Sequence, residues 1–126
     1  MLPTTPEATQ LIVDLYGCDT AILDSIEKIK AIIHTACRAL PTTIVEECYH
    51  KFEPIGISAI AVISTSHFSI HTWPEYGYAS IDIFSCDSNV PEEISTLLKE
   101  LLCATHIESK TLKRKLLLEE TIKKKG

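Results

Sequence analysis

Long hydrophobic runs are missing from this sequence of 126 residues, and none approaches the roughly 20 apolar residues that a membrane helix needs. The first residues also lack the basic and hydrophobic regions of a secretory signal. An excess of positive charge is missing too. The formal net charge is −5, so the fold has no electrostatic reason to bind nucleic acid or an anionic membrane. These absences predict a cytoplasmic protein without nucleic-acid or membrane partners.

Cysteine pairs at the short spacing of a zinc site are absent as well. The cysteines number five, an odd count that does not indicate a disulfide framework. Cys37, Cys48 and Cys103 are expected to be small buried hydrophobic residues. Cys86 differs because it follows an expected strand and stands beside Asp87 in a polar turn, where reactive groups tend to be displayed.

Internal repeats and low-complexity linkers are also absent, and 45% of the residues are hydrophobic, which predicts a single domain over residues 1–126. Periodicity and breakers predict six strands and two helices in the order β-α-β-β-β-β-α-β. This order predicts an α+β fold, in which two helices pack on one face of an antiparallel sheet to form a two-layer sandwich. The strands are expected over 11–16, 43–52, 57–63, 67–73, 78–84 and 106–113, and the helices over 21–40 and 91–104.

Three local expectations accompany this order. Asp19 or Thr20 should cap the first helix. The apolar run 57–63 is typical of a central strand covered on both faces. The tail 114–126 is expected to be a frayed helix or a disordered end with solvated charges.

Polar chemistry is concentrated in residues 63–78. His67, Ser69 and His71 alternate with Phe68 and Ile70, so the period of a strand places the polar trio on one face and the apolar pair on the other. A strand that only filled a core would not carry these side chains. The pattern predicts a reaction site held on β-structure.

The same region resembles a known family, the short prokaryotic S-adenosylmethionine decarboxylases. The resemblance rests on Ser66-His67, on the run His-Thr-Trp-Pro-Glu-Tyr-Gly-Tyr at 71–78, and on Ile-Asp-Ile-Phe-Ser-Cys at 81–86. It extends from about Leu11 to Cys86. Such enzymes are made as proenzymes that cut themselves and convert a serine into a pyruvoyl group. A covalently attached ketone is the electron sink that decarboxylation needs, and the sequence shows no phosphate cradle or Schiff-base lysine of a pyridoxal enzyme.

The resemblance implies cleavage between Thr65 and Ser66, which would yield a β chain of residues 1–65 and an α chain of residues 66–126 that begins with the pyruvoyl group. The Ser66 Oγ would attack the Thr65 carbonyl to form an ester, and elimination and hydrolysis would follow. A strained scissile peptide would favour this reaction. The resemblance also implies that Ser58 is the oxyanion partner and His71 the proton carrier of processing.

Further roles concern the substrate. The resemblance implies that the substrate amine forms a Schiff base with the pyruvoyl ketone and that Cys86 then reprotonates the substrate carbon, as a thiol can near neutral pH. Glu75 would accept hydrogen bonds from ribose hydroxyls. Phe52 and Trp73 are candidates to stack on adenine or to contact the sulfonium. His67 is expected to be structural or orienting.

Two positions depart from the family pattern. Thr65 stands where glutamate usually precedes the reactive serine, and its β-branched side chain crowds the carbonyl. Ala8-Thr9-Gln10-Leu11 stands where Gly-Arg-His-Leu is common, which removes a basic pair. These departures make slow or absent self-processing and altered substrate contacts open alternatives.

The interpretation of the sequence is therefore a pyruvoyl-dependent decarboxylase acting on S-adenosylmethionine. It would supply the aminopropyl donor for polyamine (spermidine) biosynthesis and act as a homodimer of processed protomers with shared sites. One alternative is a pyruvoyl-dependent arginine or ornithine decarboxylase. Another is an unprocessed, non-catalytic paralogue that serves as a partner subunit. A metal site of His67, His71, Glu75 and Cys86 is disfavoured, because the two histidines lie roughly 13 Å apart on an extended strand, and no metal is expected.

Overall fold

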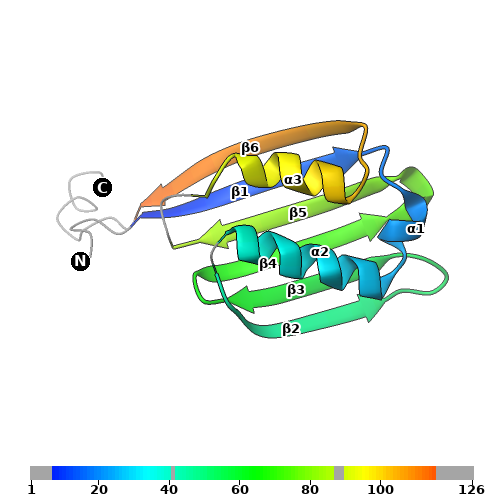
Figure 1. Ribbon diagram of the computed structural model, residues 1–126, viewed down its shortest axis with the longest axis horizontal. Coiled ribbons are helices and arrows are strands. Elements are labelled where there is room, and N and C mark those ends of the chain that lie inside the picture. The colour runs from blue at the N-terminus through cyan, green and yellow to red at the C-terminus, as the bar shows by residue number, and fades with distance from the viewer. Residues whose placement is uncertain (1–6, 41, 87–89, 116–126) are drawn as a thin grey trace, which may run out of the picture.

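The computed structural model describes residues 7–40, 42–86 and 90–115. Within these ranges the chain forms one antiparallel six-stranded sheet, with its helices on one face (Figure 1). The strands are β1 (Glu7–Tyr16), β2 (Ile44–Lys51), β3 (Ile57–Ile63), β4 (Ser66–Trp73), β5 (Tyr78–Ser85) and β6 (His106–Lys115). The helices are α1 (Thr20–Leu23), α2 (Ile26–Ala39), α3 (Glu93–Leu101) and the 3-10 turn η1 (Pro74–Tyr76).

The strands run across the sheet in the order β2-β3-β4-β5-β1-β6. Each consecutive pair along this order is antiparallel, so β1 lies between β5 and β6 and not beside β2. The longer helices α2 and α3 lie side by side across the same face (Figure 1). The predicted α+β class and the predicted order of strands and long helices are confirmed.

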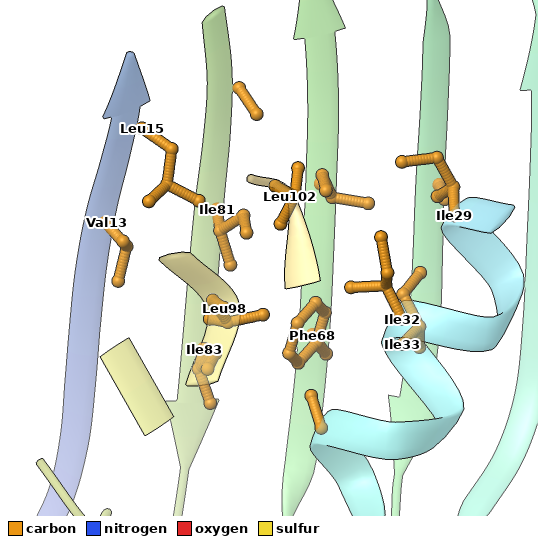
Figure 2. Packing of buried hydrophobic residues seen from close by; sticks show 14 of the residues in the cluster. Val13, Leu15, Ile29, Ile32, Ile33, Phe68, Ile81, Ile83, Leu98 and Leu102 are labelled. Atoms are coloured by element: carbon orange, nitrogen blue, oxygen red, sulfur yellow. The ribbon is translucent and has the colours of Figure 1, made fainter. Parts of the chain in front are cut away.

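The core lies between this covered face and the two long helices (Figure 2). Phe68 points from the middle of the sheet toward both helices and is fully buried, as are Ile33 of α2 and Leu98 of α3. The helices are amphipathic, so each presents one apolar stripe to the sheet. Each such side chain contributes about 1.5–3 kcal/mol when it leaves water, and this packing holds the sheet rigid beneath its other face.

The opposite face of the sheet, which we call the open face, carries no described helix. The prediction that strand 57–63 is covered on both faces is wrong. Ile57 and Ala61 are buried under the helices, whereas Ile60 is 49% and Val62 46% exposed. An apolar run reveals hydrophobicity on both sides of a strand but not whether a second layer belongs to the same chain.

The single helix predicted over 21–40 is also wrong, since Asp24 and Ser25 divide it. Asp24 leaves the helical conformation, and the Ser25 hydroxyl caps α2 by accepting a hydrogen bond from the Lys28 N–H at 3.2 Å. Asp19 caps α1 through the amides of Ala21 and Ile22, as one of the two predicted caps. Ser25 is a short polar residue that bonds to a nearby amide and so favours a cap over a helix interior, while the Asp24 carboxylate bonds to the distant Gly56 amide; together they explain the break.

The predictions that Cys48 and Cys103 are buried are wrong, whereas the one for Cys37 is confirmed. Cys37 is buried, as expected, and burial raises its pKa to about 11, with a smaller contribution from Glu47. Cys48 and Cys103 are exposed. Cys48 pairs with Ile60 on the open face, and Cys103 follows the end of α3.

The first and last strands of the chain, β1 and β6, are longer than predicted. β1 begins at Glu7, which pairs with Lys115 at the end of β6. This pairing adds residues to both strands beyond their predicted bounds. Residues 114 and 115 therefore belong to a strand, contrary to the expected frayed tail, and the remainder of that expectation lies outside the described residues. No helix in the described ranges has the length and apolar character to cross a membrane.

Candidate active site

Ser58 and His71 lie opposite one another on β3 and β4, with both side chains on the open face. The Ser58 Oγ and the His71 Nδ1 share a hydrogen bond of 2.7 Å. They line a cavity of about 370 Å³, which we call the histidine pocket. A volume of this size suits a small-molecule ligand. Its lining residues are Phe52, Ile55, Gly56, Ser58, His71, Thr72, Trp73 and Glu75.

The histidine pocket therefore contains all three predicted substrate-binding residues together with two of the predicted processing residues. Phe52 is 47% and Trp73 40% exposed, so neither ring fills the core. Glu75 lies in the turn η1 directly after β4, at the mouth of the same pocket. The period of β4 and the short turn after it bring these residues together.

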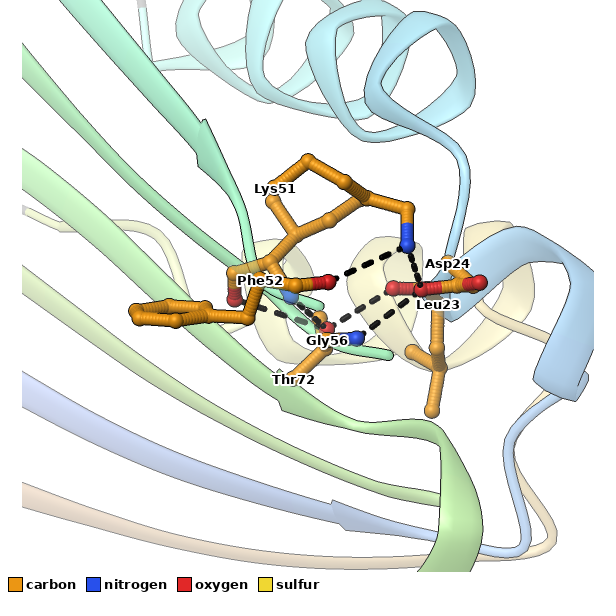
Figure 3. Close-up of polar contacts among 7 residues, drawn as sticks. Leu23, Asp24, Lys51, Phe52, Gly56 and Thr72 are labelled. Atoms are coloured by element: carbon orange, nitrogen blue, oxygen red, sulfur yellow. Dashed lines mark hydrogen bonds and ion pairs between the residues drawn. The ribbon is translucent and has the colours of Figure 1, made fainter. Parts of the chain in front are cut away.

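Polar contacts join residues that line the histidine pocket, among them Gly56 and Thr72, to neighbouring elements (Figure 3). The Asp24 carboxylate accepts hydrogen bonds from the Gly56 N–H at 2.9 Å and from the Lys51 ammonium at 2.8 Å. The Gly56 amide and, next, the Lys51 ammonium lower the pKa of Asp24 below its ordinary value. The carboxylate thus ties the β2–β3 turn to the end of α1, and in Figure 3 the Phe52 ring points away from it.

A buried hydroxyl continues this support. Thr72 is only 6% exposed; its Oγ1 donates to the Leu23 carbonyl at 2.7 Å and accepts from the Ile57 N–H at 2.9 Å. Both partners are main-chain groups that lie away from water. The residue between His71 and Trp73 therefore anchors this end of β4 to α1 and β3.

An aromatic row borders the histidine pocket on the open face. Trp73 and Tyr78 have ring centroids 5.2 Å apart, and Tyr78 lies 5.3 Å from Tyr16. The Tyr78 hydroxyl donates to the Asp14 carboxylate at 2.6 Å. Burial first, and this bond second, raise the pKa of Tyr78 to about 12, so the phenol keeps its proton at neutral pH. Of this row, Trp73 lines the pocket itself, and the two tyrosines continue the row away from it.

Thr65, Ser66 and Cys86 form a second cluster, at the hairpin between β3 and β4. Ser64 and Thr65 make the two-residue turn, and Ile63 pairs with Ser66; we call residues 63–66 the Ser66 hairpin. The main-chain N–H of Cys86 donates to the Thr65 carbonyl at 2.7 Å. The carbonyl that precedes Ser66 is therefore held and polarised by a fixed donor, and the exposed Cys86 thiol belongs to the same cluster.

Ser66 itself has a strained backbone, with a φ of +154°. A residue with a Cβ rarely adopts positive φ, and such a conformation costs roughly 1–3 kcal/mol. The neighbouring pairings of Ser66 with Ile63 and with Ser85 hold it in this state. Strain adjoining the Thr65–Ser66 peptide was part of the expectation for self-cleavage.

The two clusters lie at opposite ends of β4. Five positions separate Ser66 from His71 along the strand, which at about 3.3 Å per residue places their Cα atoms roughly 16 Å apart. Cys86 follows the end of β5 beside Ser66, whereas Tyr78 begins β5 beside Trp73. The predicted site residues therefore form two groups within one chain, a division that the sequence analysis did not predict.

A stack of side chains next to Ser66 was missed by the sequence analysis. His67 lies parallel to Phe84, with ring centroids 5.6 Å apart, and the Arg114 guanidinium lies 5.3 Å from the Phe84 centroid. This fits the expected orienting role of His67, which remains a prediction. Within residues 7–40, 42–86 and 90–115, no group of three or more His, Cys, Asp or Glu side chains could hold a metal ion.

Known proteins share this fold and sequence. A profile of the S-adenosylmethionine decarboxylase family matches residues 9–115. The S-adenosylmethionine decarboxylase proenzyme of Thermosipho africanus (strain TCF52B) is 46% identical over 93 residues, which cover 73% of this chain and 72% of that protein. The proenzyme of Caldicellulosiruptor saccharolyticus is 40% identical over 114 residues, which cover 90% of this chain and 91% of that protein.

A solved structure extends the comparison to three dimensions. The crystal structure of the adenosylmethionine decarboxylase from Aquifex aeolicus VF5 matches with a TM-score of 0.80 and 27% identity, over 92% of this chain and 97% of that chain. Residues 9–115, which the family profile matches, include both long helices and both residue clusters. The chain therefore belongs to the S-adenosylmethionine decarboxylase family.

Proposed function

We propose that this protein is a self-processing, pyruvoyl-dependent decarboxylase of S-adenosylmethionine that supplies the aminopropyl donor for polyamine biosynthesis. Family membership supports the substrate and the decarboxylase class. The observation that carries the processing step is the Ser66 hairpin, where a strained serine follows a carbonyl that accepts a hydrogen bond from the Cys86 N–H.

The hairpin fits the chemistry that would generate a pyruvoyl group. The Ser66 Oγ attacks the Thr65 carbonyl carbon, the C–N bond breaks as the hydroxyl proton passes to nitrogen, and an ester replaces the amide. Negative charge develops on the Thr65 carbonyl oxygen during the attack. The Cys86 N–H already lies 2.7 Å from that oxygen, so it stabilises the charge without rearrangement.

Elimination completes the cleavage. A base removes the Cα proton of Ser66, the ester oxygen leaves with the carboxyl group of Thr65, and the remaining dehydroalanine takes up water and releases ammonia. We assign the proton transfer to His71 and keep Ser58 as the expected oxyanion partner; the Ser58 hydroxyl, 2.7 Å from the ring, also supports the His71 imidazole. The products are a β chain of residues 1–65 and an α chain of residues 66–126.

The pyruvoyl group supplies a ketone that captures the substrate amine and accepts the electrons left behind by carbon dioxide. Cys86 lies beside this position with an exposed thiol and returns a proton to the substrate carbon. In the histidine pocket, Glu75 accepts hydrogen bonds from the ribose hydroxyls. Phe52 and Trp73 provide exposed aromatic faces for adenine or for the sulfonium.

A second copy of the chain completes the site. Ser66 and Cys86 lie at one end of β4 and His71 at the other, yet the chemistry requires contact between them. Ile60 and Ser69 face one another on the open face and occupy the row between the two clusters. A twofold axis near that row would place the Ser66 hairpin of each protomer against the histidine pocket of its partner.

The exposed apolar side chains favour this pairing. Ile60 and Val62 are close to half exposed and Leu112 is 37% exposed, all on the open face. Face-to-face packing of two sheets at about 10 Å would bury them. The separation of the clusters and the uncovered face thus support the same homodimer, with each active site built from both chains.

The decisive experiment is the intact mass of the denatured protein with and without borohydride reduction. Splitting between Thr65 and Ser66 should yield two chains whose summed mass equals that of the precursor plus water minus ammonia. Borohydride should add two hydrogen atoms to the α chain alone. A single unsplit chain after long incubation would instead indicate the non-catalytic alternative, with Thr65→Glu as the variant that tests the cause.

A further inference from the structure

Thr42 connects the last turn of α2 to the Ser66 hairpin. Its main-chain N–H donates to the Cys37 carbonyl at 3.1 Å, so its backbone is anchored to the helix. Its hydroxyl lies 2.8 Å from the Ser64 Oγ and 3.2 Å from the Thr65 Oγ1. One hydroxyl therefore contacts both residues of the two-residue turn.

Two hydrogen bonds between Ser64 and the Thr43 main chain reinforce the first of these contacts. The Ser64 N–H donates to the Thr43 carbonyl at 2.8 Å, and the Thr43 N–H donates to the Ser64 Oγ at 3.1 Å. These bonds hold Ser64 but do not reach Thr65. Among the described residues, the Thr42 hydroxyl therefore holds the Thr65 side chain, whereas the Cys86 N–H holds the Thr65 carbonyl from the β5 side.

The geometry points to Thr42 as a positioning residue for self-cleavage, an inference that rests on the proposed function. Attack by the Ser66 Oγ requires the Thr65 carbonyl carbon to lie within reach and at a suitable angle, and misplacement by about 1 Å can cost 10²-fold in rate. Rotation of Thr65 about its backbone would move that carbon. Two bonds on opposite sides of the residue prevent this rotation, and Thr42 supplies one of them.

The position of the Thr42 hydroxyl also suggests a role for the Thr65 side chain, which is its contact partner. Thr65 presents a short hydroxyl that reaches Thr42, and a bond between two hydroxyls requires no charge on either partner. The positioning contact is therefore insensitive to pH in the range where carboxylates titrate. Thr42 takes no part in bond making: it acts on the reacting carbonyl only through Thr65 and Ser64.

The test compares the rate of chain splitting in Thr42→Val, Thr42→Ser and the matched control Thr43→Val, each purified as the full-length precursor. Val keeps the shape of threonine without the hydroxyl, and Ser keeps the hydroxyl. Thr43 is an adjacent exposed threonine that bonds to Ser64 through its own main-chain N–H and C=O groups. Mass spectrometry follows splitting, and hydroxylamine, which cleaves esters faster than amides, reports ester formation separately from elimination.

We expect Thr42→Val to slow hydroxylamine-sensitive ester formation roughly 5- to 30-fold, the effect of losing a hydrogen bond that orients a reacting group. Thr42→Ser should restore most of the rate, and Thr43→Val should match the wild type. Once split, the Thr42→Val enzyme should decarboxylate at the wild-type rate per α chain, because the contact acts before the pyruvoyl group exists.

A second substitution keeps the test independent of any folding defect in Thr42→Val. Thr65→Val removes the partner hydroxyl but keeps the β-branched shape, so Thr42→Val should slow splitting less in that background than in the wild type. Equal slowing in both backgrounds, a wild-type rate in Thr42→Val, or equal slowing by Thr43→Val would overturn the role of Thr42 while leaving self-processing intact. A wild-type precursor that forms no ester would overturn the proposed function and this inference together.

Discussion

The separation of Ser66 from His71 along β4 allows a direct test of a site built from two chains. Consider a precursor with Ser66→Ala co-expressed with a precursor with His71→Ala. Neither homodimer has a complete site. In the mixed dimer, however, the Ser66 hairpin of the His71→Ala chain lies against the intact His71 of its partner, and this one site should process.

The expected magnitude follows from the geometry and from random assortment. At equal expression, each His71→Ala chain pairs with a Ser66→Ala chain in about half of the dimers. About half of the His71→Ala chains should therefore split, against almost none when that variant is expressed alone. The roughly 16 Å between Ser66 and His71 within a chain leaves no route for rescue inside one protomer.

The assay is intact mass spectrometry, with the two variants distinguished by their own masses. The control pairs His71→Ala with the double variant Ser66→Ala/His71→Ala, which supplies no imidazole and should give no rescue. If the His71→Ala chain splits no more in the mixture than alone, the shared site is refuted. If it splits fully by itself, His71 is not the proton carrier.

Three further outcomes test individual residues. Cys86→Ala should still split, because only its main-chain N–H serves processing, but turnover should fall about 10²-fold or more in a decarboxylase assay; unchanged turnover would exclude the thiol as the proton donor. Thr72→Val should lower the free energy of unfolding by about 1–3 kcal/mol in urea titration, because the Leu23 carbonyl and the Ile57 N–H lose a buried partner; an unchanged midpoint would contradict that account. The pKa of Asp24 is lowered in the folded protein, so its contribution to stability is present above the ordinary carboxyl pKa and is lost as the pH falls through the folded value. Asp24→Asn should therefore flatten the acid side of the stability–pH curve measured by thermal unfolding, and a parallel curve would count against the linkage.

Much of the fold was predictable, because the periodicity of apolar residues shows directly which side chains share one face of a strand or helix. The alternation of His67, Phe68 and Ile70 placed one face of β4 in the core, and the structure confirms that Phe68 and Ile70 are buried. The break between α1 and α2 was less accessible. From the sequence alone, Asp24 is compatible with a helix. Its carboxylate instead accepts a hydrogen bond from the Gly56 amide, which lies 32 positions away in sequence.

Candidate site residues were predictable as a set but not as an arrangement. The run from His71 to Glu75 joins a strand to a tight turn, so its members lie together in the histidine pocket by local geometry. Local geometry says nothing about Cys86, which reaches the Thr65 carbonyl only because β4 and β5 pair in one register. Thr42 gave no signal at all, since its hydroxyl acquires a partner only when the end of α2 meets the Ser66 hairpin.

The sequence by itself determined how side chains alternate between the two faces of each strand and which chemical groups the chain offers, because strand and helix periods are short-range properties of the backbone. Only the tertiary structure decided how those groups divide between the Ser66 hairpin and the histidine pocket, because that division depends on strand pairing across the sheet. It also decided that β3 lies bare on one face. The helices α2 and α3 both pack on the other side of the sheet, so nothing described in this chain covers Ile60 and Val62.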